Sequence, residues 1–349
     1  MRQNELANCT FVKTILMLLI VFYHSILFWS GDWFTGKPMF EAKPMIYVAD
    51  WLNSFHIYGF TLISGYLFYY VRFEREGYAR FIPFVMNKAK RLLIPYIFVA
   101  VFWVIPISSV FFHYSAEDLI YKYVLGTSPS QLWFLLMLFG VFTIFWPLSQ
   151  FLKRHSIVGI GIILGLYGLG LIGGKFFPNI FMVWTACMNS SVFYVGFKIR
   201  QEGSNVIRKI PSVIWILLDV LIFAVCELLS KERDVIFKIL SLGGAFVLHI
   251  VGSIMAFVVL QNLAEQHNWS NSYFNFFSER SMPVYLLHQQ IIYFFIWWLN
   301  GLINSYLNAA INFAGSLTLS LILATVLMKF KTTRFLIGEK SNQTNSKRG

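Results

Sequence analysis

The chain has 349 residues, of which 57% are hydrophobic, 19% aromatic and only 13% charged. Soluble domains carry about 25% charged residues, so this composition excludes an ordinary soluble protein and indicates that most of the chain lies in lipid. The net charge of +12 occurs as short basic runs between apolar stretches. Because such runs do not form one basic soluble face, we expect membrane lipids as partners and no nucleic acid.

Ten segments are long and apolar enough to cross a membrane, since about 20 such residues span about 30 Å of hydrocarbon. In chain order they are 11–29, 52–71, 92–112, 131–150, 157–174, 180–199, 212–229, 236–261, 282–300 and 308–329. The sequence therefore predicts an all-α, polytopic transmembrane bundle of about ten helices. The first segment has no small-x-small cleavage site after it, which favours a retained helix over a signal peptide.

Basic residues are distributed unevenly between the two sides of this bundle. With the N-terminus in the cytoplasm, 21 Lys and Arg residues fall inside and 7 outside. The positive-inside rule thus predicts that both termini are cytoplasmic. We expect the multi-pass protein to lie in the plasma (inner) membrane. The loops are too short for a soluble domain, so we expect one transmembrane domain over 1–337 and a disordered polar cytoplasmic tail over 338–349.

Two ionisable residues interrupt the first apolar segment. Lys13 and His24 are eleven residues apart, which places them within about 20° on one helix face and about 16 Å apart along its axis. Ionisable side chains at membrane depth usually face a cavity or a partner, so both are site candidates. The structural alternative is that Lys13 reaches the headgroups and His24 is a hydrogen-bonded core histidine.

Other polar residues lie in the second and ninth segments. Ser281, Tyr285 and His288 form a stripe on one face of the ninth segment, and Gln289 and Gln290 widen it. His56 lies near the outer end of the second segment. The Ser64-Gly65 pair in the same segment is more typical of helix packing.

A basic cluster lies between the second and third segments, on the predicted cytoplasmic side. It contains Arg72, Arg75, Arg80, Lys88, Lys90 and Arg91. Such a cluster suits attraction to anionic lipid, and it equally suits a phosphate-bearing ligand. The three cysteines lack the spacing of a zinc site, and we expect no metal.

Five motifs in this order resemble those of the membrane acyltransferase-3 family, whose members O-acylate sugars of surface polysaccharides. They are FVKTILMLLIVFYH (11–24), FHIYGFTLISGYLF (55–68), KAKRLLIPY (88–96), LWFLLMLF (132–139) and SMPVYLLHQQ (281–290). The first repeats the family's spacing of a basic residue and a histidine. The chain departs from the family at Lys13, where Arg is commoner, and at Thr10, where many members have an acid. Without that acid, the partner that orients His24 is unidentified.

The resemblance implies an O-acetyltransferase with acetyl-CoA as cytoplasmic donor and a surface polysaccharide or lipid-linked sugar as acceptor. His24 is implied as the catalytic base or a transient acyl carrier, because neutral imidazole suits removal of a hydroxyl proton. Lys13, Lys88 and Arg91 are implied to bind the CoA phosphates. The implied substrate-binding residues are His56, Trp133, Tyr285 and His288.

Two alternatives stand beside these expectations. Trp133 could serve only as an interfacial membrane anchor, as tryptophans often do. The whole chain could also be a transporter or flippase of a lipid-linked sugar, since polar stripes in ten helices could line a path. A transporter of this kind should contain broken helices in corresponding halves, and the sequence has no such symmetry.

Overall fold

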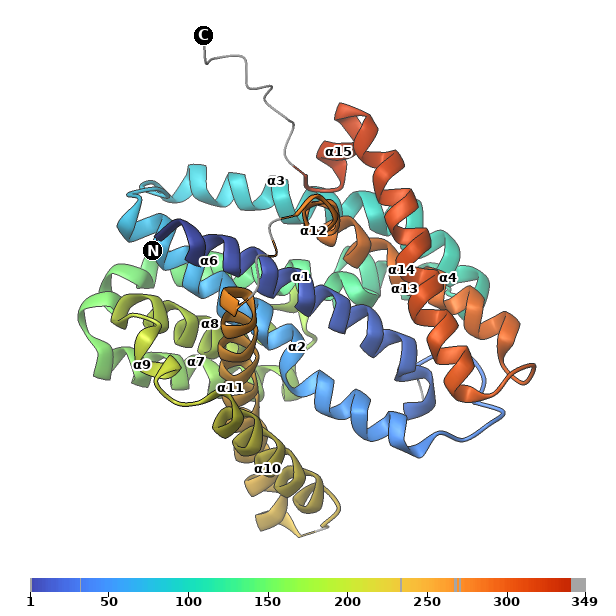
Figure 1. Ribbon diagram of the computed structural model, residues 1–349, viewed down its shortest axis with the longest axis horizontal. Helices are drawn as coiled ribbons and strands as arrows, with labels where there is room; N and C mark the ends of the chain where they lie inside the picture. Colours follow the sequence, from blue (N-terminus) through green and yellow to red (C-terminus); the bar gives the residue numbers. More distant parts are fainter. Residues whose placement is uncertain (1, 32, 233, 267–268, 270, 340–349) are drawn as a thin grey trace.

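A computed structural model describes residues 2–339 except 32, 233, 267–268 and 270. The described residues form helices joined by short loops, with no β-strand among them, as Figure 1 shows. The predicted all-α class is therefore confirmed. The predicted tail, from residue 340 onward, lies outside the described residues.

The helices of the bundle have the following bounds. The longer ones are α1 (Arg2–Ile26), α2 (Lys43–Tyr69), α3 (Phe81–Val99), α6 (Trp133–Arg154), α7 (Ser156–Phe176), α8 (Val183–Glu202), α10 (Ser212–Ser230), α11 (Val235–Gln266), α13 (Ser281–Leu299) and α14 (Ser305–Lys329). The shorter ones are α4 (Ile105–Phe112), α5 (Ala116–Leu119), α9 (Asn205–Arg208), α12 (Ser272–Ser278) and α15 (Lys331–Leu336). Short 3-10 turns include η1 (Leu27–Ser30), η5 (Ser130–Leu132) and η6 (Ile180–Met182), and π-helical turns include η2 (Tyr70–Glu74), η3 (Ala100–Val104) and η4 (Ile120–Val124).

Within the described part of the chain, eight helical spans are long and apolar enough to cross a membrane, with mean hydropathies between 1.4 and 2.4. The polytopic bundle is thus confirmed. Helices α2 and α13 are also long, at 27 and 19 residues, but they are not among the eight spans. Both contain buried polar side chains, among them His56 and His288. The two helices that look least like membrane spans are therefore two of those that carry the predicted site.

The third predicted segment begins earlier than expected. We predicted a helix from residue 92, with Lys88 and Arg91 in a preceding loop, whereas α3 begins at Phe81. The helix continues without interruption through η3 and α4 to Phe112. Lys and Arg have high helix propensity, so a helix can extend past its apolar part through a basic stretch. Lys88 and Arg91 are thus held by a regular helix.

Helices α2 and α8 approach each other unusually closely. A Cβ atom on Gly65 of α2 would lie 2.0 Å from the carbonyl oxygen of Phe193, and one on Gly196 of α8 would lie 1.9 Å from that of Leu62. Each glycine therefore leaves room for the other helix's backbone, as small residues do in membrane helix pairs. This contact gives Gly65 the packing role expected for it.

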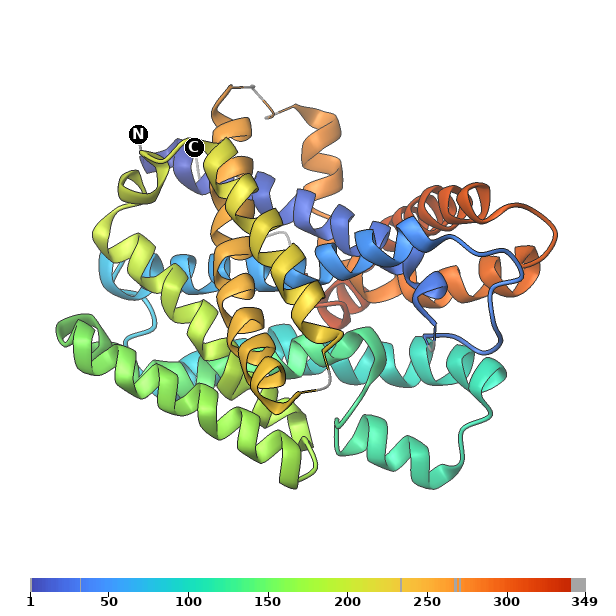
Figure 2. The same cartoon turned by 90° about the horizontal axis from the view of Figure 1, so that it is seen from below.

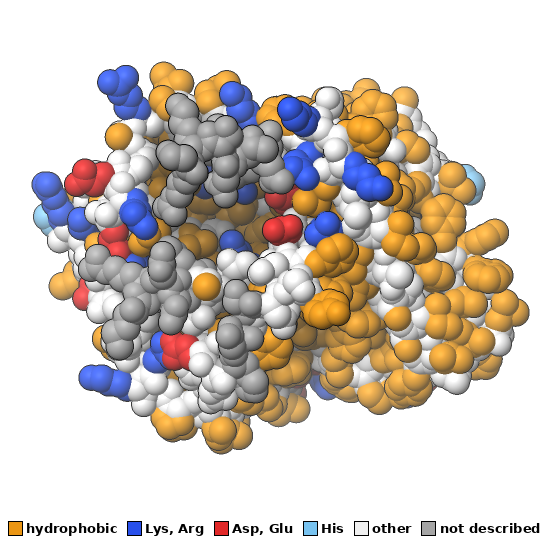
Figure 3. Space-filling model, turned by 45° about the horizontal axis from the view of Figure 1, so that its top comes forward, with side chains coloured by type: hydrophobic (Ala, Val, Ile, Leu, Met, Phe, Trp, Pro, Cys, Tyr) orange, Lys and Arg blue, Asp and Glu red, His pale blue; other side chains and the backbone are white. Residues whose placement is uncertain are grey.

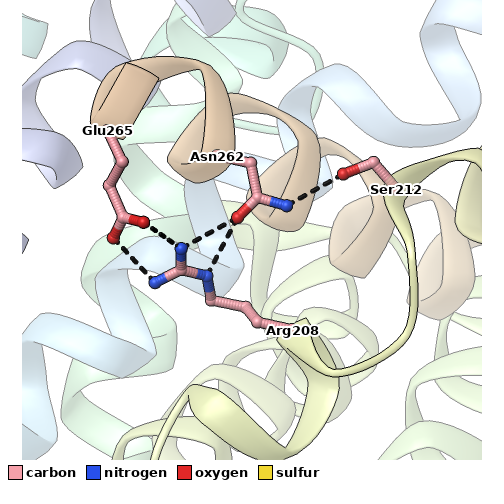
Figure 4. A network of polar contacts seen from close by, with 4 residues as sticks. All are labelled: Arg208, Ser212, Asn262 and Glu265. Carbon is pink, nitrogen blue, oxygen red and sulfur yellow. Dashed lines mark hydrogen bonds and ion pairs between the residues drawn. The ribbon is translucent and has the colours of Figure 1, made fainter. Parts of the chain in front are cut away.

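The α10 and α11 helices form a hairpin that runs crosswise to α1 and α2 in both views (Figures 1 and 2). Polar contacts fix its ends. Arg208 bonds to Glu265 and Asn262, and Asn262 bonds to Ser212 at 2.9 Å (Figure 4). Further along α10, the buried Asp219 accepts a hydrogen bond of 2.8 Å from Trp51 Nε1 of α2.

Helix α1 lies at the centre of the bundle. It packs against α2, α11, α13 and α14, and its apolar residues contribute to both hydrophobic cores. Residues on the inner faces of α1 are therefore surrounded by other helices rather than by lipid. This placement brings His24 to the site described next.

Candidate active site

A cavity of about 250 Å³ lies against the second half of α1. Its wall is formed by the end of α1, the following loop, α2, the start of α6 and α13. The residues that line it are Ile20, Tyr23, His24, Leu27, Trp33, Asn53, His56, Ile57, Ser130, Gln131, Trp133, Tyr285 and Gln289. Asn53 is exposed, so the cavity reaches the molecular surface beside it. The cavity thus combines aromatic rings with imidazole and amide groups.

His24 and His288 are in direct contact at this cavity. Nε2 of His288 lies 3.0 Å from Nδ1 of His24, and the two ring centroids are 4.9 Å apart. His288 is fully buried on α13 and is not itself among the lining residues. It therefore stands behind His24 and supplies a partner in place of the missing acid.

Backbone carbonyls determine which nitrogen atoms of this pair carry hydrogen. Nδ1 of His288 lies 2.8 Å from the carbonyl oxygen of Tyr285 and 3.1 Å from that of Val284. Because carbonyl oxygens only accept, Nδ1 of His288 donates, and Nε2 of the neutral ring accepts from Nδ1–H of His24. Nδ1 of His24 also lies 3.0 Å from the carbonyl oxygen of Ile20. The lone pair of neutral His24 is then on Nε2.

His24 Nε2 makes no hydrogen bond to any of the residues that the structure describes. In a neutral imidazole of this kind, one nitrogen donates a hydrogen bond and the other has a free lone pair. The nitrogen with the lone pair can take up a proton. This is the arrangement of a general base whose orientation is fixed by a neighbour. The cavity at His24 can therefore support removal of a proton from a hydroxyl group.

The structure brings three further predicted site residues to the same cavity. His56 and Trp133 line it from α2 and α6, and the His56 ring lies 4.6 Å from that of Tyr23. Tyr285 also lines it, but its hydroxyl donates to the backbone oxygen of Gln131. The Tyr285 proton is thus already engaged, and the ring rather than the hydroxyl is offered to a ligand.

Several lining residues were not singled out from the sequence as site residues. Tyr23, Trp33 and Asn53 lie near the histidines in the chain, while Ser130 lies in the short turn η5 before α6. The sequence marks Gln289 only as part of the polar stripe on α13. In the sequence, these residues differ from others only in lying close to a motif residue. That position does not show whether a side chain lines a cavity or packs between helices.

The three predicted phosphate-binding cations form a separate group. The charges of Lys13 on α1 and of Lys88 and Arg91 on α3 lie close enough to act on one another. One face of the molecule has a hollow with basic and acidic side chains around it (Figure 3). Arg91 is exposed. This group is therefore one place where a polyanion would find several cations together.

Lys88 differs from Arg91 in its surroundings. Its Nζ lies 3.8 Å from the centroid of the Phe142 ring and donates to the Tyr78 hydroxyl at 3.3 Å. A Lys ammonium over an aromatic face is stabilised by the ring quadrupole. Lys88 is thus already held by an aromatic pocket, whereas Arg91 is exposed and is the most accessible of the three cations.

The end of the described chain packs against the same group. A Cβ atom on Gly338 would lie 2.8 Å from the Pro95 ring and 2.9 Å from the carbonyl oxygen of Arg91. The next residue, Glu339, lies near the charges of Arg91 and Lys13, and burial raises the pKa of its carboxyl group while those charges and Arg334 oppose the rise. An acidic side chain of the protein therefore stands beside the cations.

Apolar side chains separate the cation group from the cavity. Met17 and Ile20 follow Lys13 on the face of α1 that leads to His24, and each is only 1% exposed. Ile20 lines the cavity whereas Lys13 does not. Along this face of α1, a ligand that contacts both Lys13 and His24 passes the buried side chain of Met17.

The chain matches a known protein family over most of its length. Residues 7–329 match the model of a protein family described as an acyltransferase domain. No curated protein matches the chain, and no solved structure matches it. The family match includes every residue of the cavity and of the three-cation group.

Proposed function

The chain belongs to the acyltransferase-3 family, and from this premise we propose that it moves an acetyl group from cytoplasmic acetyl-CoA to a hydroxyl of a cell-surface polysaccharide or lipid-linked sugar. It is a multi-pass membrane acyltransferase. The proposal adds the donor, the acceptor, the plasma membrane as its location, and an orientation with both termini in the cytoplasm. The observation that carries it is the His24–His288 pair at the cavity.

His24 acts as the general base in this proposal. Its Nε2 takes the proton of the acceptor hydroxyl as the oxygen attacks the thioester carbonyl carbon. A C–O bond forms and the C–S bond breaks, and the proton passes from His24 to the departing CoA thiolate. His288 accepts a hydrogen bond from His24 Nδ1–H throughout, and so stabilises the imidazolium that forms in between.

The donor enters from the face of the three-cation group. Arg91 and Lys13 bind the CoA phosphates there, and Lys88 adds its charge from the aromatic pocket. The distance along α1 from Lys13 to His24 is about 16 Å, so the thioester end of an extended donor can pass along α1 toward His24. Displacement of Met17 opens this route, which suits a flexible methionine side chain.

The acceptor enters the cavity from the opposite end of α1. The Trp133 ring provides an apolar face for a sugar, and His56 and Tyr285 form the adjoining wall. With the N-terminus inside, this cavity opens on the extracytoplasmic side. The two substrates thus reach His24 from opposite sides, and only the acetyl group needs to cross the bundle.

The test compares the host with the intact gene, with the gene deleted, and with the deletion complemented by wild type or by His24→Ala. Acetate released from the surface polysaccharide by mild base is measured, and membrane levels of the protein are checked by immunoblot. We expect acetate to be lost on deletion, restored by wild type and absent with His24→Ala. Complementation with His249→Ala is the control, because His249 is stacked on Tyr58 and does not line the cavity.

Two outcomes would contradict the proposal. Wild-type acetate in the His24→Ala strain would exclude His24 as the base. Unchanged acetate in the deletion strain, together with reduced polysaccharide export, would favour the transporter alternative.

A further inference from the structure

One buried acceptor atom in the cavity wall has no donor. Gln289 lines the cavity and is 3% exposed, and its Oε1 makes no hydrogen bond within the described residues. An unsatisfied buried polar atom costs about 1–3 kcal/mol. Native proteins keep few such atoms, and those near a ligand site are often satisfied when the ligand binds.

The other end of the same amide is fixed. Nε2 of Gln289 donates to Ser130 Oγ at 3.0 Å and to the Tyr293 hydroxyl at 2.5 Å. These two contacts determine the position of the amide beside the cavity. The amide is thus held at the cavity wall with Oε1 as its unused acceptor.

Neighbouring glutamines do not share this feature. Gln290, the next residue on α13, exchanges two hydrogen bonds with Gln131, of 2.6 and 3.1 Å. That pair satisfies both amides internally and ties α13 to η5. The unused acceptor of Gln289 is therefore not a general property of the polar stripe.

The surroundings of Gln289 indicate what kind of donor it would meet. Trp33 and Trp133 line the same cavity, and aromatic faces stack on the C–H surface of sugar rings while leaving ring hydroxyls free. None of the described residues that line the cavity is Lys or Arg, so its polar groups suit a neutral ligand with several hydroxyl groups better than an anionic one.

We propose that Gln289 is a specificity residue that accepts a hydrogen bond from a hydroxyl group of the sugar acceptor, other than the hydroxyl that is acylated. This inference rests on the proposed function and adds the contact that orients the acceptor. Gln289 holds the sugar through one hydroxyl while His24 Nε2 receives the proton of another. Ser130 accepts a hydrogen bond from the Gln289 amide and so positions that side chain.

The experiment uses purified protein in nanodiscs, which both substrates can reach. The probes are radiolabelled acetyl-CoA and the host's surface polysaccharide from which acetyl groups have been removed by mild base. Gln289→Met keeps the side-chain length and removes the amide. We expect its KM for the polysaccharide to rise about tenfold, with the KM for acetyl-CoA unchanged.

A second variant protects the test against misfolding. Ser130 has a φ of +53°, a conformation that glycine adopts without strain. Ser130→Gly therefore removes the hydroxyl without introducing backbone strain. We expect Ser130→Gly to raise the KM for the polysaccharide, as Gln289→Met does. Gln261→Met is the matched control, because Gln261 is also buried with an unpaired Oε1 but lies outside the cavity.

Three outcomes separate this inference from the proposed function. Wild-type polysaccharide KM values in both Gln289→Met and Ser130→Gly would overturn the inference and leave the proposed function standing. A fall in kcat at an unchanged polysaccharide KM would also overturn it. If wild-type protein transfers no label to the polysaccharide, the proposed acceptor fails and the inference fails with it.

Discussion

Nε2 of His288 lies 3.0 Å from Nδ1 of His24, although 264 residues separate them in the chain. The contact joins α13 to α1 at the cavity. In a serine hydrolase, a carboxylate holds the catalytic histidine in the correct tautomer. Here a second imidazole, itself held by two backbone carbonyls, occupies that position.

Removal of this partner should slow catalysis more than it weakens binding. His288→Ala leaves Nδ1–H of His24 with only the Ile20 carbonyl, so the ring is less firmly oriented. We expect kcat for acetyl transfer to fall about 100-fold with little change in the KM for either substrate. His249→Ala should retain wild-type kinetics, and equal losses in the two variants would argue against a specific role for His288.

The size of residue 17 should control donor access. Met17→Trp places a larger, stiffer side chain between Lys13 and His24, so we expect acetyl transfer to be lost while the protein still accumulates in membranes. Met17→Leu nearly conserves volume and should remain active. Activity in the tryptophan variant equal to that of the leucine variant would show that the donor takes another route.

Loss of an exposed cation should weaken donor binding. Arg91→Ala is expected to raise the KM for acetyl-CoA about tenfold, with an unchanged polysaccharide KM, because the phosphate contact is lost on the donor side only. Added salt should raise the donor KM of wild type more than that of the variant. Lys175→Ala, which removes an exposed cation at the end of α7, should behave as wild type.

Neutralisation of Glu339 should have the opposite effect. Glu339→Gln removes a negative charge beside Arg91 and Lys13, so the KM for acetyl-CoA should fall. Because burial raises the pKa of this carboxyl above its ordinary value of 4.5, the charge is suppressed at low pH and appears as pH rises. The effect of the variant should therefore be larger at pH 8 than at pH 5. Glu41→Gln, on the α1–α2 loop, is the control.

The close contact of α2 and α8 should not tolerate a methyl group. Gly65→Ala places a carbon 2.0 Å from the Phe193 oxygen, so the helices must separate at a cost of about 1–3 kcal/mol. We expect a lower thermal unfolding midpoint in detergent. Gly161→Ala on α7 meets nothing within 4 Å and should unfold at the wild-type temperature or slightly above it.

Most of the long helices could be predicted because a helix that spans a membrane needs a long apolar stretch, and the predicted segment 157–174 lies within α7. The prediction placed the start of α3 wrongly, since a helix that continues beyond the hydrocarbon has no apolar signal there. The sequence identified His24 and His288 as two separate candidate site residues. Their contact could not be predicted, because hydrophobic periodicity does not specify which faces of α1 and α13 meet.

The cavity was less predictable than its histidines. Ser130 and Asn53 reach it from a short turn and from the first half of α2, and neither lies in an ionisable or strongly patterned context. Gln289 and Gln290 are adjacent and identical in type, yet one lines the cavity and the other is paired with Gln131. The two side chains point in different directions from α13, and the orientation of this helix about its own axis decides which of them faces the cavity.

The mutual glycine contact of α2 and α8 also has a mechanical consequence. With each backbone oxygen seated where the other helix would carry a β-carbon, neither helix can slide along the other without a collision. These two helices therefore move as one rigid body, and His56 is fixed to it. A movement that widens the cavity therefore has to shift α1, α6 or α13 relative to this pair, because these helices form the rest of its wall.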